Sequence, residues 1–335
     1  VFHCFLKIIL KCLKQNICTN LNMEYRQFNQ TGLFVSEIGI GTNRFGHKVD
    51  KKDVVKILHY CADNNINHID TANVYANGKS EEILGESFGN LRKDFIIGTK
   101  VGWNNSYDNN LGLLSSRSIN YHVNNSLTKL KTDYIDILWL HKWDNTTHID
   151  ETLTTINSLI NLGKIRYIGI SNFNSWQTAL TLVKAKTIYN IEIIATQSEY
   201  NLINRNTYSE LYECLKYFNL SLVPFFPLAS GFLTGKYKKN NIPENSRAEW
   251  ADYMKVMFKS NYFSFIEELS VIAKRYECSL AEISIAWLLS HSNVTSVING
   301  VRNVKQLKEN IKSSVIQINM NDLILIDSMY EKHFN

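Results

Sequence analysis

Four polar side chains in this chain stand at or just after the ends of short apolar runs, and their types suit acid–base chemistry. Asp70 and Lys100 each end such a run, His141 directly follows another, and Tyr75 lies five positions after Asp70. Turns favour Gly, Asn and Asp, so a Lys and a His at these positions are harder to explain as turn formers. Singly, each residue has an ordinary explanation as a turn former, a solvent-exposed lysine, a packing aromatic or a loop histidine. Together they predict a catalytic cluster.

The chemistry that fits these four residues is the reduction of a carbonyl group. A hydride acceptor needs a proton donor for the developing alkoxide, and a phenol with a pKa of about 10 holds its proton too tightly unless its environment is tuned. Lys100 near Tyr75 would lower the pKa of the phenol, and Asp70 would be the counter-ion of a buried Lys100. His141 would hydrogen-bond the substrate oxygen and orient it. Since the protein supplies no hydride, a cofactor is required.

The elements that must position these residues alternate regularly along the chain. Nearly continuous apolar runs predict strands buried on both faces of a parallel sheet. The predicted strands are Val35–Gly41, Ile66–Asp70, Phe95–Lys100, Tyr134–Leu140, Ile165–Ile170, Glu192–Thr196, Ser221–Phe226 and Thr295–Ile298. Longer amphipathic stretches predict helices at Lys51–Asn64, Lys79–Phe88, Arg117–Leu130, Asp150–Asn161, Ser175–Ile188, Thr207–Phe218, a region ending near Arg275, Leu280–Ser290, Val304–Ile311 and Asn321–Tyr330. Ser80 and Asn321 are expected N-caps, and Gly163 an expected helix stop.

Eight strand–helix units in one chain predict a (β/α)8 TIM barrel with eight parallel strands. A doubly wound open sheet is the alternative, but it carries a glycine-rich dinucleotide turn after its first strand. Here Gly39-Ile40-Gly41 is followed by Thr42-Asn43-Arg44, so that motif is not completed. Because no linker-like stretch divides the chain, we expect residues 23–335 to form a single domain. The long connection from Gly231 to about Lys259 is a candidate lid.

Composition and charge narrow the functional class. The chain of 335 residues is 44% apolar and 20% charged, which is enough for a sizeable core. Without the three lysines of residues 1–22 the formal charge falls from +5 to +2, so no basic patch argues for nucleic acid. No stretch is apolar for long enough to span a bilayer. The scattered cysteines suit a reducing compartment such as the cytoplasm, with Cys61, Cys214 and Cys278 as free thiols.

Residues 1–22 have two interpretations. The stretch from Phe5 to Lys14 has the pattern of a basic amphipathic helix, typical of a targeting or membrane-surface segment. Met23 stands directly before the first fold-like pattern, which favours an upstream extension outside the fold.

From about Met23 to its end the chain resembles the aldo-keto reductase family. Many short motifs occur in the family's order, which makes the resemblance specific. They include Val35-Ser36-Glu37-Ile38-Gly39, Asp70-Thr71-Ala72, Gly78-Lys79-Ser80-Glu81, Thr99-Lys100-Val101-Gly102, Gly169-Ile170-Ser171-Asn172-Phe173, Gln197-Ser198-Glu199-Tyr200-Asn201, Pro227-Leu228-Ala229-Ser230-Gly231 and Leu233-Thr234-Gly235-Lys236.

The resemblance implies a reductase of aldehydes or ketones in which Tyr75 donates the proton and Asp70, Lys100 and His141 complete a tetrad. It also implies a nicotinamide cofactor, with Phe225 at the place where the family usually stacks a Tyr or Trp. The matching cofactor-binding positions are Ser171, Asn172, Gln197, Phe225, Leu228, Gly231, Gly300, Arg302, Gln306, Glu309 and Asn310. Arg302 could pair with a 2′-phosphate, which favours NADPH over NADH.

The substrate and the partners are less well defined. Phe45, Trp103 and Trp143 are expected at the mouth of the substrate pocket, with a small carbonyl compound as substrate. No ligand pattern for a metal occurs at the strand ends. The family also includes channel-associated β subunits that bind cofactor and sense redox state, and members that oxidise sugars or alcohols. These two alternatives, and the oligomeric state, stay open.

Overall fold

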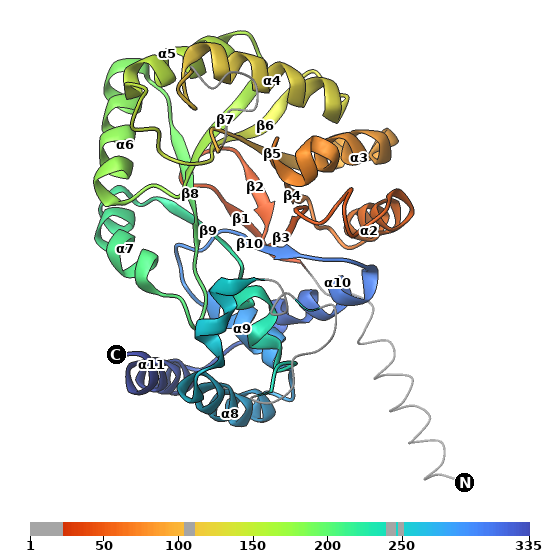
Figure 1. Cartoon of the computed structure of the whole chain (residues 1–335), viewed down its shortest axis with the longest axis vertical. Coiled ribbons are helices and arrows are strands. Elements are labelled where there is room, and N and C mark those ends of the chain that lie inside the picture. Colours follow the sequence, from red (N-terminus) through yellow and green to blue (C-terminus); the bar gives the residue numbers. More distant parts are fainter. Residues whose placement is uncertain (1–22, 104–110, 239–245, 247–250) are drawn as a thin grey trace.

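The protein folds as a closed barrel of eight parallel strands (Figure 1). The computed structural model describes residues 23–103, 111–238, 246 and 251–335, so the predicted extension 1–22 lies outside the described residues. Neighbouring strands follow the order β10-β3-β4-β5-β6-β7-β8-β9. The strands are β3 (Ile38–Gly41), β4 (His68–Asp70), β5 (Ile96–Val101), β6 (Ile135–Leu140), β7 (Ile165–Ser171), β8 (Ile193–Glu199), β9 (Ser221–Phe225) and β10 (Val297–Gly300). The predicted (β/α)8 TIM barrel is confirmed.

Helices surround the barrel and bury its outer face (Figure 1). They are α2 (Lys51–Asp63), α3 (Lys79–Ser87), α4 (Ser116–Leu130), α5 (Ile149–Asn161), α6 (Ser175–Tyr189), α7 (Asn206–Phe218), α8 (Ser260–Arg275), α9 (Leu280–Leu289), α10 (Val304–Ile311) and α11 (Met320–Phe334). Gly163 follows α5 with a φ of +71°, as expected for a helix stop. The N-cap of α11 is Asn319 rather than Asn321, and its side chain accepts from the amide of Asp322. Among the described residues, no helix is both long and apolar enough to cross a bilayer.

The predicted first strand, Val35–Gly41, is divided in two. Strands β1 (Tyr25–Gln27) and β2 (Phe34–Ser36) form an antiparallel hairpin, and β3 begins after Glu37. The buried carboxylate of Glu37 is bound by the guanidinium of Arg26 at 2.7 Å, which fixes the bend between hairpin and barrel. Phe28 of the hairpin is fully buried and contacts the ring of His68 at the start of β4. The hairpin therefore closes the end of the barrel at which the strands begin.

A single tryptophan fills much of the barrel interior. Trp139 on β6 is fully buried, and its strand neighbours in register are Lys100 on β5 and Gly169 on β7. A Cβ atom on Gly169 would overlap the indole ring, and one on Gly98 would lie 2.6 Å from Nε1. The two glycines thus make room for the indole, which packs within the barrel alongside the strand that carries Lys100.

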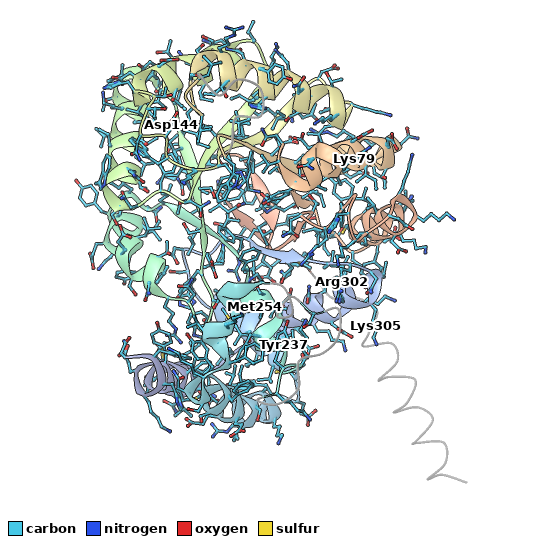
Figure 2. All side chains as sticks on the ribbon, viewed as in Figure 1. Lys79, Asp144, Tyr237, Met254, Arg302 and Lys305 are labelled. Atoms are coloured by element: carbon cyan, nitrogen blue, oxygen red, sulfur yellow. The ribbon has the colours of Figure 1, made fainter. Side chains whose placement is uncertain are left out.

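The described part of the candidate lid contains short helices. It contains part of the 3-10 helix η3 (Ala229–Thr234) and all of η5 (Asp252–Phe258), whereas residues 239–245 and 247–250 lie outside the described residues. Tyr237 and Met254 are both buried in the larger core cluster (Figure 2). Cys61, Cys214 and Cys278 are free thiols.

Candidate active site

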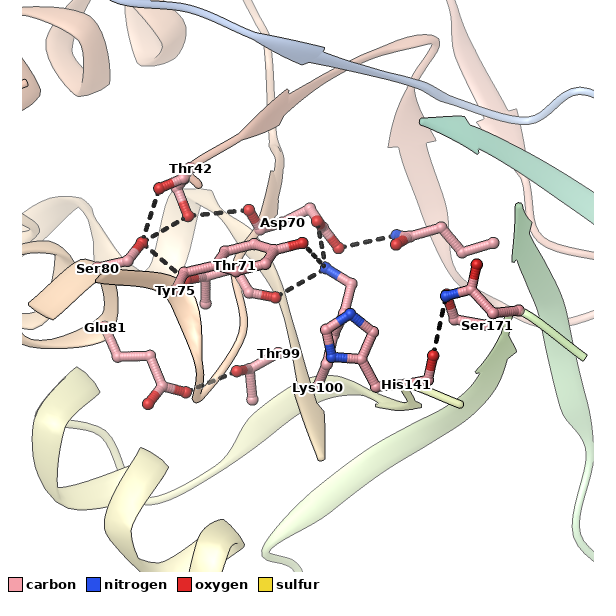
Figure 3. A network of polar contacts seen from close by, with 12 residues as sticks. Thr42, Asp70, Thr71, Tyr75, Ser80, Glu81, Thr99, Lys100, His141 and Ser171 are labelled. Carbon is pink, nitrogen blue, oxygen red and sulfur yellow. Dashed lines mark hydrogen bonds and ion pairs between the residues drawn. The ribbon is translucent and has the colours of Figure 1, made fainter. Parts of the chain in front are cut away.

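The four predicted catalytic residues meet at the C-terminal ends of three adjacent strands (Figure 3). Asp70 ends β4, and His141 directly follows β6. Lys100 is the last residue but one of β5, which continues to Val101. Tyr75 begins the short 3-10 helix η1 (Tyr75–Gly78) after β4. Because parallel strands end at one rim of a barrel, the four side chains from distant parts of the sequence become neighbours.

The ammonium group of Lys100 is the centre of the cluster. It donates to Asp70 Oδ2 at 2.5 Å, to the backbone carbonyl of Thr71 at 2.9 Å and to Tyr75 Oη at 3.2 Å. An ammonium has three donors, so these contacts use all of them. Asp70 is thus the counter-ion of buried Lys100, as expected. The other carboxylate oxygen of Asp70 accepts from Gln197 Nε2 at 2.8 Å.

Burial and charge set the protonation of Lys100 and Tyr75. Burial acts to lower the pKa of Lys100, but Asp70 and Tyr75 together raise that pKa above its ordinary value, so the group stays charged. Burial raises the pKa of Tyr75, and this effect outweighs the lowering by Lys100. Lys100 acts to lower the pKa of the phenol, as expected, but burial leaves that pKa above its ordinary value. The phenol holds its proton firmly across the neutral pH range.

His141 is a neutral imidazole at the wall of the site. Burial and the charge of Lys100 lower the pKa of His141 to about 2. Its ring contacts Tyr75 edge-on at a centroid distance of 6.2 Å and Trp103 at 4.8 Å. Its backbone carbonyl accepts from Asn172 Nδ2 at 3.0 Å, which links β6 to the end of β7. A neutral imidazole retains one N–H with which to donate to a substrate oxygen.

A left-handed turn holds Tyr75 in place. The three residues after it, Ala76, Asn77 and Gly78, have φ values of 49°, 56° and 87°. A positive φ is unfavourable for Ala, so the surrounding contacts must maintain this conformation. Gly78 is favoured by its conformation, since a Cβ there would meet mainly the ammonium end of the flexible Lys129 side chain from α4, which can move aside. Gly78, not Ser80, is the N-cap residue of α3, which corrects the predicted cap.

A cavity of about 730 Å³ opens over the cluster. Asp70, Tyr75 and His141 line it together with Trp103. All eleven predicted cofactor-binding residues line the same cavity, namely Ser171, Asn172, Gln197, Phe225, Leu228, Gly231, Gly300, Arg302, Gln306, Glu309 and Asn310.

The residues nearest the cluster fit a nicotinamide group. Asn172 has a φ of 57° and donates from Nδ2 to His141 O and Ser171 Oγ, which leaves its side-chain carbonyl as an acceptor. Gln197 likewise uses its amide nitrogen on Asp70 and retains an acceptor. Phe225 is half-buried in the cavity lining, where it offers the face of an aromatic ring. Two amide acceptors beside an aromatic face suit a carboxamide-bearing ring.

The far end of the cavity fits phosphate. Helix α10 starts there with Asn303 as its N-cap, and the N-terminus of a helix favours anions. A Cβ on Gly300 would meet just one atom, Asn43 Oδ1 at 3.9 Å, so backbone and ligand can approach closely. Arg302 is exposed at this end and supplies a positive charge. The described residues therefore fit a nicotinamide dinucleotide with phosphate groups at this end.

Two expected pocket residues lie elsewhere. Phe45 is fully buried in the core, and the half-buried Trp143 packs against Phe173 and Trp176, so neither lines the cavity. The cavity is lined instead by charged and polar residues that sequence reasoning missed. They include Asn43, Arg44, Lys48 and Lys236. Lys236 Nζ lies 2.9 Å from the position of a Cβ on Gly231. Its place in the motif Leu233-Thr234-Gly235-Lys236 was a signal that could have found it.

Known proteins resemble the chain over most of its length. The aldo/keto reductase family profile matches residues 37–331. A probable voltage-gated potassium channel subunit beta of Oryza sativa subsp. japonica is 36% identical over 87% of this chain and 91% of the relative. The corresponding protein of Arabidopsis thaliana is 35% identical over the same shares. The uncharacterized oxidoreductase YrpG of Bacillus subtilis is 31% identical over 92% of this chain and 96% of the relative. The chain belongs to the aldo/keto reductase family.

Proposed function

We propose that the protein reduces aldehydes or ketones to alcohols with NADPH, and that Tyr75 is the proton donor. The observation that carries the proposal is the hydrogen-bonded group of Asp70, Lys100 and Tyr75, which lies beside His141 in a cavity suited to a dinucleotide. Membership in a family of oxidoreductases supports the same reaction class.

The four residues would divide the chemistry among them. Bound nicotinamide supplies the hydride to the carbonyl carbon. Tyr75 gives its phenolic proton to the carbonyl oxygen, so the product is the neutral alcohol and a tyrosinate remains. Lys100 stabilises that tyrosinate from 3.2 Å, and Asp70 keeps Lys100 charged. The phenol then regains its proton from water. Neutral His141 donates a hydrogen bond that orients the carbonyl oxygen.

The test is NADPH consumption with a panel of aromatic and aliphatic aldehydes, using Tyr75→Phe as the control. Removing the phenolic hydroxyl should lower kcat by about 100-fold or more. Binding of NADPH, followed by fluorescence, should stay unchanged because Tyr75 acts on the substrate oxygen. Undiminished turnover in the variant would remove Tyr75 from the proposal.

A second candidate function is that of a cofactor-bound regulatory subunit. It is supported by the names of two relatives, which are described as probable potassium channel β subunits. The two functions predict different retention of NADPH and different rates of aldehyde reduction. A regulatory subunit would retain NADPH through purification and reduce every panel member slowly, whereas a reductase would turn over at least one aldehyde many times.

A further inference from the structure

Three buried hydroxyl groups lie directly beside the strand end that carries Asp70. Thr42 follows β3, Thr71 follows β4, and Ser80 lies in the first turn of α3. All three side chains are fully buried. Figure 3 shows them as a linked group next to Asp70 and Lys100. The proposed chemistry assigns none of them a role.

The hydroxyl groups form a chain with one direction. Thr42 Oγ1 donates to the carbonyl of Asp70 at 3.0 Å, and that carbonyl can only accept. The Ser80 hydroxyl donates to the carbonyl of Thr42 at 2.9 Å and lies 2.8 Å from Thr42 Oγ1. Since its single proton is used in this way, Ser80 Oγ must accept from Thr71 Oγ1 at 3.0 Å. Thr71 thus donates to the Ser80 hydroxyl, Ser80 donates to the backbone carbonyl of Thr42, and the Thr42 hydroxyl donates to the backbone carbonyl of Asp70.

These hydrogen bonds hold the backbone of Thr71, whose carbonyl accepts a hydrogen bond from the Lys100 ammonium. The carbonyl of Thr71 is one of the three acceptors of the Lys100 ammonium, and the amide of Thr71 donates to Gly98 O at 2.8 Å. The Asp70–Thr71 segment is thus fixed to β5 on one side and, through Ser80, to α3 and the loop after β3 on the other. Ser80 is the central link because it contacts both threonines.

We propose that Ser80 is a positioning residue for the reduction, acting through Thr71 and Asp70 on the placement of the Lys100 ammonium beside Tyr75. The inference rests on the proposed function, since the reaction is the one assigned to Tyr75. We expect Ser80 to affect kcat and not the binding of the cofactor, because Thr42, Thr71 and Ser80 lie outside the lining of the dinucleotide cavity. Small displacements of a catalytic group cost large factors in rate.

The matched pair of variants is Ser80→Ala and Ser87→Ala. Both serines lie on α3, and the buried hydroxyl of Ser87 has no hydrogen-bond partner among the described residues. Ser80→Ala should lower kcat roughly 10- to 100-fold, while the KM for NADPH stays within about twofold. Ser87→Ala should leave both constants unchanged. Ser80→Cys restores the volume but has a weak donor, so it should recover the melting temperature and only part of kcat.

Amide exchange gives a readout that does not depend on turnover. The amide of Thr71 should exchange faster with solvent deuterium in Ser80→Ala than in Ser87→Ala, because the turn has lost its link to α3. A folded Ser80→Ala protein with wild-type kcat and wild-type Thr71 exchange would overturn the proposal. Full recovery of kcat in Ser80→Cys would also overturn it, since packing would then be sufficient.

Failure of the positioning role and failure of the proposed function give different results. If wild type reduces no aldehyde while Thr71 exchange still depends on Ser80, the reductase function and the catalytic role of Ser80 both fall, and the structural link alone stands. If Ser80→Ala does not fold, Thr71→Val removes the next hydroxyl of the chain at nearly constant shape. A loss of kcat of roughly 10- to 100-fold in Thr71→Val supports the proposal, and an unchanged kcat overturns it.

Discussion

The ammonium group of Lys100 lies 3.2 Å from the phenol oxygen of Tyr75, and yet the pKa of that phenol is raised above its ordinary value. Burial is the main cause, and the lowering by Lys100 is further opposed by the carboxylate of Asp70, which raises the pKa. Lys100 and Asp70 form a pair with no net charge, so the attraction of the lysine for a phenolate is largely offset. The phenol therefore keeps the proton that a reduction requires.

The first prediction concerns the pH dependence of reduction at saturating NADPH. We expect kcat to stay level from about pH 6 to about pH 10, because the pKa of Tyr75 is raised above the value of about 10 at which an ordinary phenol ionises. His141 adds no step in the neutral range, because its pKa is lowered to about 2. The measurement is kcat across this pH range with one aldehyde. A decline in kcat centred near neutral pH would contradict the assigned protonation states.

The second prediction concerns stability in acid. Burial and the charge of Lys100 lower the pKa of His68 to about 3, while an unfolded histidine has a pKa of about 6.5. Between these values the unfolded chain binds a proton that the folded chain does not, so stability is fully present above about pH 6.5 and is lost as pH falls toward 3. The contribution of His68 should drop by about 2 kcal/mol between about pH 7 and pH 5.

Urea unfolding of His68→Gln measures that contribution. The free energy of unfolding of this variant should fall less between the two pH values than that of wild type, by about 2 kcal/mol. The control is His59→Gln on the exposed face of α2, which should keep the wild-type dependence. Parallel curves for wild type and His68→Gln would show that His68 does not titrate in this way.

The third prediction concerns packing beneath the site. Gly169→Ala places a methyl group against the indole of Trp139 and should lower the free energy of unfolding by about 1–3 kcal/mol. Trp139→Phe in the same chain should restore part of the loss, because a smaller ring leaves space for the methyl group. The control is Gly32→Ala, where an added Cβ meets nothing within 4 Å. Denaturant unfolding of these proteins and of Trp139→Phe alone gives the free energies of unfolding, and additive losses in the double variant would exclude direct competition for space.

The barrel and the tetrad could be predicted from sequence because both depend on regular features. Apolar runs that alternate with amphipathic stretches specify the strands, and the end of a parallel strand has one place in the barrel, so Asp70 and Lys100 could be paired across 30 positions. No comparable regularity predicts where a side chain in an irregular loop will point. Phe45 and Arg44 are adjacent in the same loop, yet the first enters the core and the second lines the cavity.

Two further features of the site could not be predicted, because they depend on contacts between residues that are far apart in the sequence. Ser80 has the residue type and position of a helix cap, but the left-handed Gly78 begins the helix instead and frees Ser80 to contact two threonines. The pKa of Tyr75 depends on how deeply the folded chain buries the phenol. Neither depth nor tertiary hydrogen bonding is encoded in a local pattern.

The fourth prediction concerns the choice of cofactor. If Arg302 pairs with a 2′-phosphate, Arg302→Gln should raise the Kd for NADPH by about 10-fold or more and leave the Kd for NADH unchanged, because only NADPH carries that group. The control is Lys305→Gln on α10, since Lys305 is exposed near Arg302 but does not line the cavity (Figure 2). Fluorescence titration gives both constants. Equal weakening of both cofactors would place Arg302 on a phosphate that they share.

The fifth prediction concerns the charge of the substrate. The predicted cofactor residues lie near or after the C-terminal ends of strands β7 to β10, so we expect the loops after β3 to β6 to contact the substrate. The loop after β3 runs beside the Tyr75 segment, because Thr42 bonds Asp70 and Gly46 packs against Lys79. Two cations of this loop, Arg44 and Lys48, line the cavity.

A positive wall attracts an anionic substrate more strongly than a neutral one. We expect para-carboxybenzaldehyde to exceed para-tolualdehyde in kcat/KM by about 10-fold, with the ratio falling as salt screens the charges. The double variant Arg44→Gln, Lys48→Gln should abolish the preference. The control is Lys142→Gln, whose ammonium lies 5.9 Å from the Trp103 ring centroid but outside the cavity lining. If the double variant instead weakens NADPH binding and keeps the preference, the two cations serve the cofactor rather than the substrate.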